Sequence, residues 1–584
     1  MKFDDLLVAV GEFGPYQRRI YFLLCLPALL CGAQVLSAVF IMAIPDYRCK
    51  IPAFANDSFQ IRNRAHGDLA NMSIPRVSSS TSGFSQCLVY SDVWRAAKEY
   101  DHVEPAAGGL AKWRNAWNTT SVENGMKFDS TRETRQCHEW VYDRSEFDST
   151  AITEFDLVCE DTILRSICNS VMFAGALVGA IAMGVVADVC GRKRAIMICL
   201  LAQFVTSLCV CLTPSFTIMI VLKSLSGIAT HSLFSVGATM GIELVGPTKR
   251  SFTGMVVEFF WAGGILLALP IAYISRNWRY TQLTICLLTV PLFALWWLIP
   301  ESPRWLLNKR RYTEARQVLE KICHSNRTKL PQDFLDADIA SDGPQEGLSR
   351  LCSKRNLICR TGVIFFNWLA VNLLYYGLSL STDNLSGSTY INYLLGVVLE
   401  ILAYILTFLL VDKTGRRRFH FICMLVSGIA CLATVLPTRI GGKEYQWLVT
   451  GFALTGRMFS SGAYAILYLM SAELFPTVVR NSAIGTCNVF ESLGGIISPY
   501  IADLGLIVGG PFSQSLPMFV FGSVSLVAGG LSLTLPETLG QPMPETIQDT
   551  IDLNKRKKSL SPSNGFVAPM LDCNSQTPLS SSQV

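Results

Sequence analysis

The sequence is poor in charge: Asp, Glu, Lys and Arg make up 16% of its 584 residues, whereas roughly 25% is usual in a globular chain. Neither sign is in large excess, because 49 basic residues accompany 44 acidic ones and the net charge is only +5. Half of the residues are apolar, and the mean hydropathy is +0.36. A chain of this composition cannot cover its apolar surface with charge in water, which argues against a soluble enzyme, a disordered scaffold and a nucleic-acid-binding protein.

Common catalytic motifs are also missing from the sequence. It contains no metal-spaced cluster of Cys and His, no phosphate-binding glycine loop and no Gly-x-Ser-x-Gly nucleophile elbow. We therefore expect no enzymatic activity, no metal, no cofactor and no nucleic-acid partner.

What the chain does contain is twelve apolar runs, and a run of about 20 residues is long enough to span roughly 30 Å of hydrocarbon. In lipid only helices and closed barrels satisfy the backbone hydrogen bonds, and barrel strands are alternating segments of about ten residues. The runs therefore predict an all-α membrane protein with twelve transmembrane helices. They cover residues 20–43, 166–187, 194–213, 216–242, 253–275, 281–299, 359–381, 389–411, 419–437, 447–470, 482–505 and 515–535.

Lysine and arginine gather in alternate short loops, and such loops face the cytoplasm. They follow the second, fourth and eighth spans, whereas the loops after the third, seventh and eleventh spans have none. This pattern predicts that both termini, residues 1–19 and 536–584, are cytoplasmic, with a large extracellular loop at 44–162 and a cytoplasmic linker at 300–358. The basic loop residues are Arg192, Lys193, Arg194, Lys249, Arg250, Lys413, Arg416, Arg417 and Arg418.

Four of the nineteen cysteines lie in the predicted extracellular loop, where an oxidising environment favours disulfides. Four cysteines allow three pairings, and the sequence leaves the choice open. Glycosylation sequons at Asn56, Asn71 and Asn118 lie in the same loop, and a fourth at Asn384 follows the seventh span. The tripeptide at Asn326 lies in the linker and is expected to stay unmodified. The four cysteines are Cys49, Cys87, Cys137 and Cys159.

Three short patterns occur twice, at offsets of 224, 230 and 236 residues. They predict two six-helix bundles, residues 20–299 and 359–535, joined by the linker. Parallel repeats with a substrate site between them near the midplane are typical of rocking transporters. The pairs are Asp188-x-x-Gly191-Arg192 with Asp412-x-x-Gly415-Arg416, Glu243 and Arg250 with Glu473 and Arg480, and Pro300-Glu301-Ser302 with Pro536-Glu537-Thr538.

The charged residues of the first two patterns are candidates for a gate. Carboxylates and guanidinium groups at helix ends can form ion pairs between helices, and such pairs would break when the halves rock. The alternative is that the basic residues only set the topology and hold lipid headgroups, but their recurrence in both halves favours the gate. The candidate gating residues are Asp188, Gly191, Arg192, Glu243, Arg250, Asp412, Gly415, Arg416, Glu473 and Arg480.

The run Gly184-x-x-x-Asp188-x-x-Gly191-Arg192-Lys193-Arg194 resembles the signature of the major facilitator superfamily. Five further segments resemble the organic cation, carnitine and organic anion transporter family (solute carrier 22-like) within it. The second repeat has Phe408 in place of Gly184, a common relaxation. Covering residues 4–547, the resemblance implies twelve helices in two bundles, facilitated transport by alternating access and no covalent chemistry. The five segments are residues 10–17, 153–159, 300–307, 473–477 and 536–540.

Ionisable residues at bilayer depth are costly and are therefore candidates for function. Glu258, Glu400 and Glu491 lie inside the fifth, eighth and eleventh spans. Glu400 resembles an acid that cation and anion carriers of the family share. Arg457 and Lys223 resemble basic positions of several branches, and the alternative for both is a structural role beside a buried acid.

The eleventh span is expected to separate substrate classes. Two residues before its Gly494-Gly495 pair, cation carriers of the family tend to have Asp, whereas anion and carnitine carriers tend to have Arg. This chain has Ser492 there. The missing Arg weakens an anion interpretation, and Glu258 and Glu491 favour a cation. Adjacent helical residues point about 100° apart, so Glu491 could face either a cavity or a packed neighbour.

Aromatic and imidazole side chains add to the cation interpretation. His231 and Phe234 share a face of the fourth span and match positions where cation carriers have a Lys and a Trp, and Tyr375 and Tyr376 match a Tyr-Gln pair in the seventh span. Aromatic faces attract ammonium groups by roughly 0.5–2 kcal/mol per ring, although aromatics in spans also simply pack. His231 could in addition couple transport to protons.

The sequence thus predicts a polyspecific transporter of small organic cations, or of amine-bearing zwitterions, in the plasma membrane. The alternatives are an organic anion or carnitine-like zwitterion transporter of the same family and, from another class, a transport-dead ligand-binding receptor on this fold. Residues 548–584 are expected to be disordered, and the terminal Ser582-Gln583-Val584 resembles a PDZ-domain ligand. The candidate substrate-binding residues are His231, Phe234, Glu258, Tyr375, Tyr376, Glu400, Arg457, Glu491 and Ser492.

Overall fold

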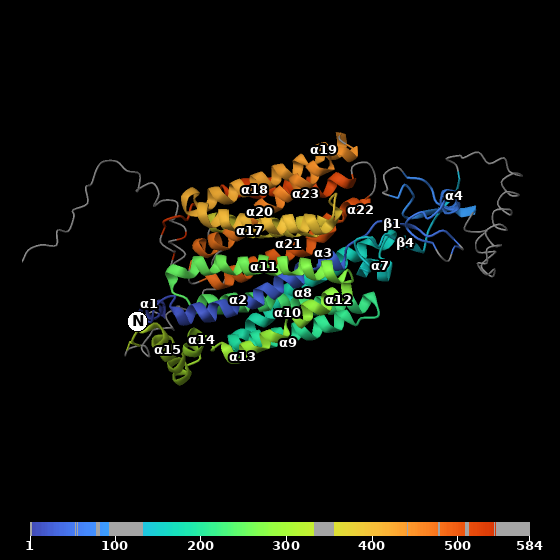
Figure 1. The fold of residues 1–584 in the computed structure, drawn as a ribbon. Helices are drawn as coiled ribbons and strands as arrows, with labels where there is room; N and C mark the ends of the chain where they lie inside the picture. Colours follow the sequence, from blue (N-terminus) through green and yellow to red (C-terminus); the bar gives the residue numbers. More distant parts are fainter. Residues whose placement is uncertain are drawn as a thin grey trace, which may run out of the picture.

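The structure is a computed structural model, and almost all of its long elements are helices that run side by side (Figure 1). It describes residues 3–52, 54, 57–77, 82–92, 132–331, 355–440, 442–476, 479–508, 513–541, 544 and 550. The predicted all-α architecture is confirmed, and each of the twelve predicted runs lies on a helix or on two helices in succession. Nine stretches of the described helices are long and apolar enough to cross a membrane, and the shorter Leu516–Ser532 is also apolar.

The first half of the chain contributes the helices in the lower part of Figure 1. Pro15 is the first residue of α2, where its missing N–H costs no hydrogen bond, and the Ser215 side chain caps the start of α10. The helices are α2 (Pro15–Leu36) with α3 (Ala38–Ile41), α8 (Thr162–Cys190), α9 (Arg192–Cys211), α10 (Phe216–Glu243), α11 (Arg250–Ser275), and α12 (Trp278–Leu287) with α13 (Leu295–Leu298).

The second half forms the helices in the upper part of Figure 1. Its α21 packs against α8 of the first half, and its α17 packs against α11, so these two pairs join the halves. The helices are α16 (Arg355–Leu380), α17 (Thr389–Thr414), α18 (Arg416–Ala433), α19 (Val435–Ile440), α20 (Gln446–Leu474), α21 (Arg480–Ala502), α22 (Leu504–Val508) and α23 (Leu516–Ser532).

Close packing within the first half depends on small residues, as is typical of membrane helices. Helices α8 and α10 cross where Gly175 faces the main chain of Ser224 and Gly227 faces that of Met172. A Cβ at either glycine would overlap with the facing carbonyl oxygen, so only glycine permits this approach.

A small disulfide-bonded subdomain lies at one end of the bundle, at the right of Figure 1, and we call this end the loop end. The disulfides Cys49–Cys137 and Cys87–Cys159 join all four cysteines predicted to pair, and they select one of the three pairings. The elements of the subdomain are β1 (Tyr47–Cys49) paired antiparallel with β4 (Trp140–Tyr142), β2 (Leu88–Tyr90) paired antiparallel with β3 (Thr134–Gln136), α4 (Arg64–Ser73) and α7 (Ala151–Phe155).

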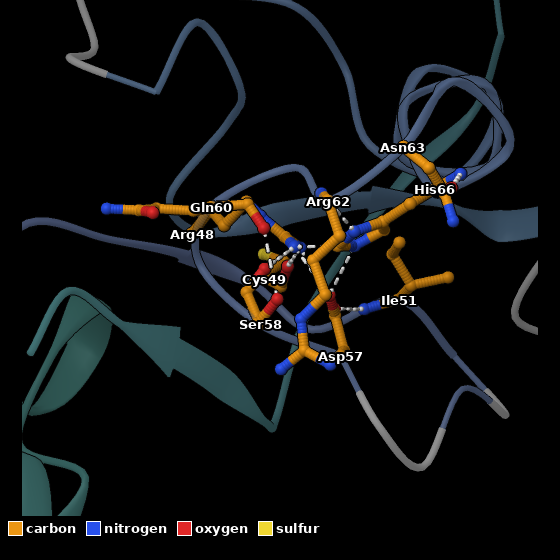
Figure 2. A network of polar contacts seen from close by, with 9 residues as sticks. All are labelled: Arg48, Cys49, Ile51, Asp57, Ser58, Gln60, Arg62, Asn63 and His66. Atoms are coloured by element: carbon orange, nitrogen blue, oxygen red, sulfur yellow. Dashed lines mark hydrogen bonds and ion pairs between the residues drawn. The ribbon is translucent and has the colours of Figure 1, made fainter.

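A buried ion-pair network holds the subdomain together (Figure 2). The Arg48 guanidinium donates to Asp57 through Nη1 at 2.9 Å, and His66 Nε2 lies 2.8 Å from the same carboxylate. The side chains of Arg48 and Asp57 are fully buried. Burial by itself raises the pKa of Asp57, but hydrogen bonds from Arg48, the Ile51 amide and His66, with the Arg48 charge, hold it below its usual value.

The predicted glycosylation sites are only partly described. Asn71 lies in α4, where its side chain accepts a hydrogen bond from Arg76 Nε at 2.8 Å, whereas Asn56 and Asn118 lie outside the described residues. Asn384 ends a short 3-10 helix after α16. Asn326, predicted to stay unmodified, donates to the Val10 carbonyl at 2.9 Å at the opposite end of the bundle.

That opposite end carries the repeated charged motifs, and we call it the motif end. Here α1 (Phe3–Ala9) packs against α14 (Pro303–Asn308) and α15 (Tyr312–Asn326) through a separate apolar cluster. These short helices lie at the left of Figure 1, at the opposite end from β1, β4 and α4. Residues 332–354 and 551–584, which include most of the tail, lie outside the described residues.

Candidate functional site

A cavity lies between the two halves, lined from the first half by α10 and α11 and from the second by α16, α17, α20 and α21. Its volume is about 20 Å³, which is room for roughly one water molecule. The cavity is therefore nearly closed in this structure. Its lining residues are His231, Phe234, Glu258, Trp261, Tyr375, Tyr376, Tyr404, Tyr464 and Glu491.

Two carboxylates in this lining have no positively charged partner in the part of the chain that the structure describes. Glu491 accepts a hydrogen bond from the Tyr464 hydroxyl at 2.9 Å, and Glu258 accepts none from the described residues. Among those residues, no Lys, Arg or His nitrogen forms an ion pair with either carboxylate. Both residues are half-buried, so the cavity carries negative charge that only a ligand or a proton would neutralise.

Glu400 differs from these two, because its charge is already compensated. It is fully buried on α17 and lies 3.2 Å from Arg457 Nη2 on α20. The hydroxyls of Tyr375 and Tyr404 donate to it at 2.7 and 3.0 Å. Glu400 thus lies behind the cavity wall, and Arg457 forms an ion pair with a buried acid, which is the contact that its structural alternative requires.

Aromatic side chains form most of the wall. Trp261 Nε1 donates to the Tyr375 hydroxyl at 3.0 Å, which connects the two halves. Phe234 meets Trp261 edge-on with 5.4 Å between ring centres, and Tyr464 stacks on Tyr375 at 5.8 Å. Such a wall suits an ammonium group, because the ring faces carry negative charge density.

Three lining residues were not among the sequence candidates: Trp261, Tyr404 and Tyr464. Helical spacing could have identified two of them, because Trp261 is three residues after Glu258 and Tyr404 is four after Glu400, so each shares a helix face with an acid. Tyr464 lies opposite Glu491 on a different helix. No sequence spacing indicates that neighbour.

Three other candidates occupy different environments. His231 lines the cavity, and its Nε2 is buried without a hydrogen-bond partner among the described residues. Ser492 is buried, at 8% exposure, and is not part of the lining. Lys223 is buried on α10, two turns before His231, and is also outside the lining.

The predicted gating residues form two matching clusters at the motif end. In the first half, Arg192 pairs with Asp188 at 2.8 Å and with Glu243 at 3.2 Å. Glu301 accepts hydrogen bonds from the Arg192 and Lys193 amides at 2.9 and 3.1 Å, which caps the start of α9.

In the second half, Arg416 pairs with Asp412 at 2.8 Å and lies 3.4 Å from Glu473. Glu537 accepts from the Arg416 amide at 2.8 Å and so caps the start of α18. The sequence repeat is therefore also a repeat in three dimensions.

Each cluster lies within one half, whereas the gate hypothesis requires pairs that break as the halves rock. Rigid rotation of the halves would leave Arg192 with Glu243 and Arg416 with Glu473. Arg250 pairs instead with Asp4 of α1 at 2.6 Å, and Arg480 Nε donates to the Phe475 carbonyl at 3.1 Å. Gating by these residues stays a prediction, and their present geometry is that of bonds within each half.

An ion pair that does join the halves lies at the loop end. Arg165 of α8 contacts Asp383, which follows α16, at 2.5 Å and Asp503, which follows α21, at 3.4 Å. The Ser166 hydroxyl donates to Asp503 at 2.6 Å. The three charged side chains are at most 4% exposed. These contacts join the two halves at the loop end.

Comparison with known proteins identifies the family of this chain. The model of the sugar (and other) transporter family matches residues 115–548. The chain is 33% identical to the organic cation transporter protein of Drosophila melanogaster, over 95% of this chain and 96% of that one. It is 30% identical to solute carrier family 22 member 1 of Oryctolagus cuniculus, over 95% and 96%.

The chain belongs to the organic cation, carnitine and organic anion transporter family of the major facilitator superfamily. It is thus a multi-pass membrane transporter and not an enzyme. The solved structure of the xylose transporter XylE from E. coli in a partially occluded inward-open conformation has a TM-score of 0.56 at 14% identity, over 90% of this chain and 99% of that one. This likeness confirms the major facilitator fold predicted from the sequence.

One human relative is named for carnitine as well as for organic cations. The chain is 29% identical to organic cation/carnitine transporter 2 of Homo sapiens, over 96% of both chains. The cavity between the halves is therefore the candidate substrate site of a transporter, at the position where transporters built from two repeats bind their substrates.

Proposed function

We propose that this protein transports small organic cations, and zwitterions that carry an amino group, through the cavity between its halves. The observation that carries the proposal is the pair of uncompensated carboxylates, Glu258 and Glu491, inside an aromatic wall. A desolvated organic ammonium regains there, from a carboxylate and from ring faces, the interactions that it loses with water.

The distribution of positive charge supports a cation over an organic anion. Arg457 faces Glu400 at 3.2 Å and is buried away from the cavity. No Lys or Arg is among the lining residues, so a substrate carboxylate would find no positively charged side chain in the described lining. The relatives named as an organic cation transporter and as an organic cation/carnitine transporter agree with this choice.

Transport would proceed by alternating access. The site lies at the interface of two structural repeats, and rocking of one against the other exposes it to either side in turn. In this scheme the contacts of Arg165 with Asp383 and Asp503 hold the loop end closed and separate when that end opens.

The proposed location and orientation rest on the sequence. We assign the loop end to the outside and the motif end, with both termini, to the cytoplasm, because the motif end carries the short basic loops. The same proposal places the protein in the plasma membrane, with its basic loops in contact with lipid headgroups. It also includes glycans on Asn56, Asn71 and Asn118 and a PDZ-domain partner for the tail.

Uptake into proteoliposomes tests the proposed substrate class. Purified protein is reconstituted into vesicles, and separate samples are incubated with radiolabelled tetraethylammonium, carnitine or benzoate. We expect time-dependent, saturable uptake of tetraethylammonium, weaker uptake of carnitine and none of benzoate. Uptake of benzoate alone would replace the proposal with an anion carrier, and saturable binding without accumulation of any probe would indicate a receptor.

A further inference from the structure

The two unpaired carboxyl groups of the cavity point to a second ion in the transport cycle. We propose that Glu258 and Glu491 hold one proton between them when the cavity is empty and that an organic cation displaces this proton, so that the protein exchanges organic cations for protons. The inference rests on the proposed function, because it requires that the cation enters this cavity.

The geometry places both acids in one space with little room for water. Glu258 on α11 and Glu491 on α21 come from opposite halves, and each lies within electrostatic range of the other. With about 20 Å³ of free volume, roughly one water molecule fits. Two like charges that share so small a site repel each other, and a single proton shared between carboxyl groups removes that repulsion.

The hydrogen bonds indicate which acid carries the proton. Glu491 accepts from the Tyr464 hydroxyl at 2.9 Å, and a hydrogen-bond donor stabilises the ionised form of a carboxyl group. Glu258 accepts no hydrogen bond from the described residues. We therefore assign the proton to Glu258 and the permanent negative charge to Glu491.

The charged and basic neighbours do not offer another place for this proton. Glu400 is paired with Arg457 and hydrogen-bonded by Tyr375 and Tyr404. His231 lines the cavity with an unpartnered Nε2, but it packs on Phe173, with 5.9 Å between ring centres, and no described acid forms an ion pair that would stabilise its protonated ring.

The remaining ionisable neighbours are hydroxyl and thiol groups, which are ordinarily protonated at neutral pH. They come from α2, α16, α17, α20 and α21, the helices that pack around the two acids. These neighbours are Tyr21, Tyr376, Tyr404, Tyr464, Tyr468 and Cys487.

The charge count makes the exchange electrically neutral. With a proton on Glu258, the empty site has one negative charge, that of Glu491. When a monovalent cation enters, the O–H bond of Glu258 breaks, the proton leaves to solvent, and two carboxylates with one cation again sum to one negative charge. The carrier thus crosses with the same charge in both directions, and one cation is exchanged for one proton.

Proteoliposomes with the membrane potential set to zero by potassium and valinomycin test the exchange. Tetraethylammonium is the probe, because its charge does not change with pH. With the lumen one pH unit more acidic, a one-for-one exchange is expected to concentrate the probe about tenfold inside. Probe uptake that follows voltage and ignores the pH gradient would overturn the exchange and leave the proposed function intact, whereas no uptake under any gradient would overturn both.

Substitution of Glu258 tests the assignment of the proton. The E258Q protein has no carboxyl to protonate there, so its empty and loaded forms differ by one charge. We expect accumulation driven by the pH gradient to disappear and uptake driven by an inside-negative voltage to appear. Glu258→Asp is expected to restore the exchange, and Glu320→Gln, at an exposed residue of α15, is expected to behave as wild type. Retention of accumulation driven by the pH gradient in E258Q would overturn the assignment.

A direct proton count keeps the proposal testable if E258Q does not fold. Wild-type protein in detergent is mixed with tetraethylammonium in weakly buffered dye solution at neutral pH. Release of one proton per bound cation is expected. Binding without proton release would overturn the proposal.

Discussion

At the scale of single residues, the carboxylates at the centre of the molecule divide into one that is compensated and two that are not. Glu400 has an arginine at 3.2 Å and two tyrosine hydroxyls, which satisfy its charge in a fully buried position. Glu258 and Glu491 face the cavity without such partners. Removing each kind of acid should therefore have a different consequence, because the first is held in an ion pair within the fold and the others line the proposed substrate site.

Glu491→Gln is expected to weaken binding while leaving the fold intact. The substitution keeps the shape but removes the charge, and the loss of a partly desolvated ion contact costs about 1.5–3 kcal/mol, or roughly a 10- to 150-fold loss of affinity. The measurement is the KM for tetraethylammonium uptake per surface-expressed molecule, with Glu320→Gln as the matched control. An unchanged KM in a well-expressed protein would exclude Glu491 from the binding site.

Glu400→Gln is expected to reduce stability more than affinity. It leaves Arg457 buried without a counter-charge, and breaking a buried ion pair in this way costs about 3–5 kcal/mol. Thermal unfolding in detergent should show a lower melting temperature, and removing both charges as Glu400→Gln with Arg457→Gln should recover part of it. A single variant as stable as wild type would show that the pair contributes nothing to the fold.

At the scale of elements, the repeated motifs act as helix caps. Gly191 and Gly415 have φ values of 104° and 88°, a conformation that favours glycine, and a new helix begins at the residue directly after each. Glu301 and Glu537 then accept the first free amides of α9 and α18. The two glycines thus reverse the chain sharply. The two glutamates satisfy N–H groups that the start of a helix leaves unpaired.

Gly191→Ala is expected to destabilise this turn by about 1–3 kcal/mol, because a residue with a Cβ is strained at this backbone conformation. The added Cβ would also overlap with the Glu301 carboxylate. Gly184→Ala is the control, since Gly184 lies within α8 with no atom near its Cβ position; there we expect no loss. Melting temperatures that fall equally in both variants would contradict the assignment.

The Arg48–Asp57 network is expected to make the stability of the disulfide-bonded subdomain depend on pH. Because the pKa of Asp57 is lowered in the folded state, the stabilisation is complete above the ordinary pKa of about 3.9 and is lost as the pH falls through the lowered value. Asp57→Asn removes it at every pH. Hydrogen exchange of residues 47–66 should therefore differ strongly between wild type and variant at pH 7 and converge in acid.

The matched control for this comparison is Asp68→Asn, at an exposed position of α4 in the same subdomain. It should exchange like the wild type throughout. A difference between wild type and Asp57→Asn that persists unchanged in strong acid would show that the charge of Asp57 is not the stabilising element.

At the scale of the whole molecule, the contacts between the halves define the conformational state. Arg165 joins the first half to Asp383 and Asp503 of the second at the loop end, and Trp261 reaches Tyr375 at the cavity. Near the motif end the halves meet through rings such as Phe252 and Phe408, with 6.5 Å between centres. The charged contacts that must separate for the loop end to open are thus concentrated in a few residues.

Arg165→Ala is expected to shift the population toward forms open at the loop end. It leaves Asp383 and Asp503 buried without a cation, which costs the closed form about 3–5 kcal/mol and lowers the closed-to-open ratio by a factor of roughly 10² to 4 × 10³. A cysteine placed at Phe40, which is 3% exposed and packs on Tyr390 of the other half, should then react with an impermeant thiol reagent.

The labelling needs a background without Cys209, an exposed native thiol of α9, so Cys209→Ser is included throughout. Arg316→Ala, which breaks only an exposed pair within α15, is the control and should leave the Phe40→Cys thiol protected. Equal protection in the Arg165→Ala variant would show that this ion pair does not hold the loop end closed.

The sequence by itself determined the helices, the internal repeat and the family. Apolar run length predicts a membrane helix because the hydrocarbon thickness is fixed, and all twelve runs lie on helices. The paired motifs predicted two equivalent structures, and Arg192–Glu243 and Arg416–Glu473 are indeed equivalent. Local chemistry also predicted which cysteines form disulfides, although not the pairing.

The tertiary structure alone decided which charges are paired and which remain free. Apolar periodicity specifies a helix but not its neighbours or its rotation, so it could not indicate that Glu400 faces Arg457 while Glu491 faces Tyr464. Nor could it indicate that Arg165 and Asp383, 218 residues apart, meet at the loop end. Ion pairs and cavities arise where helices distant in sequence are packed together, and packing is a property of the assembled halves rather than of any single segment.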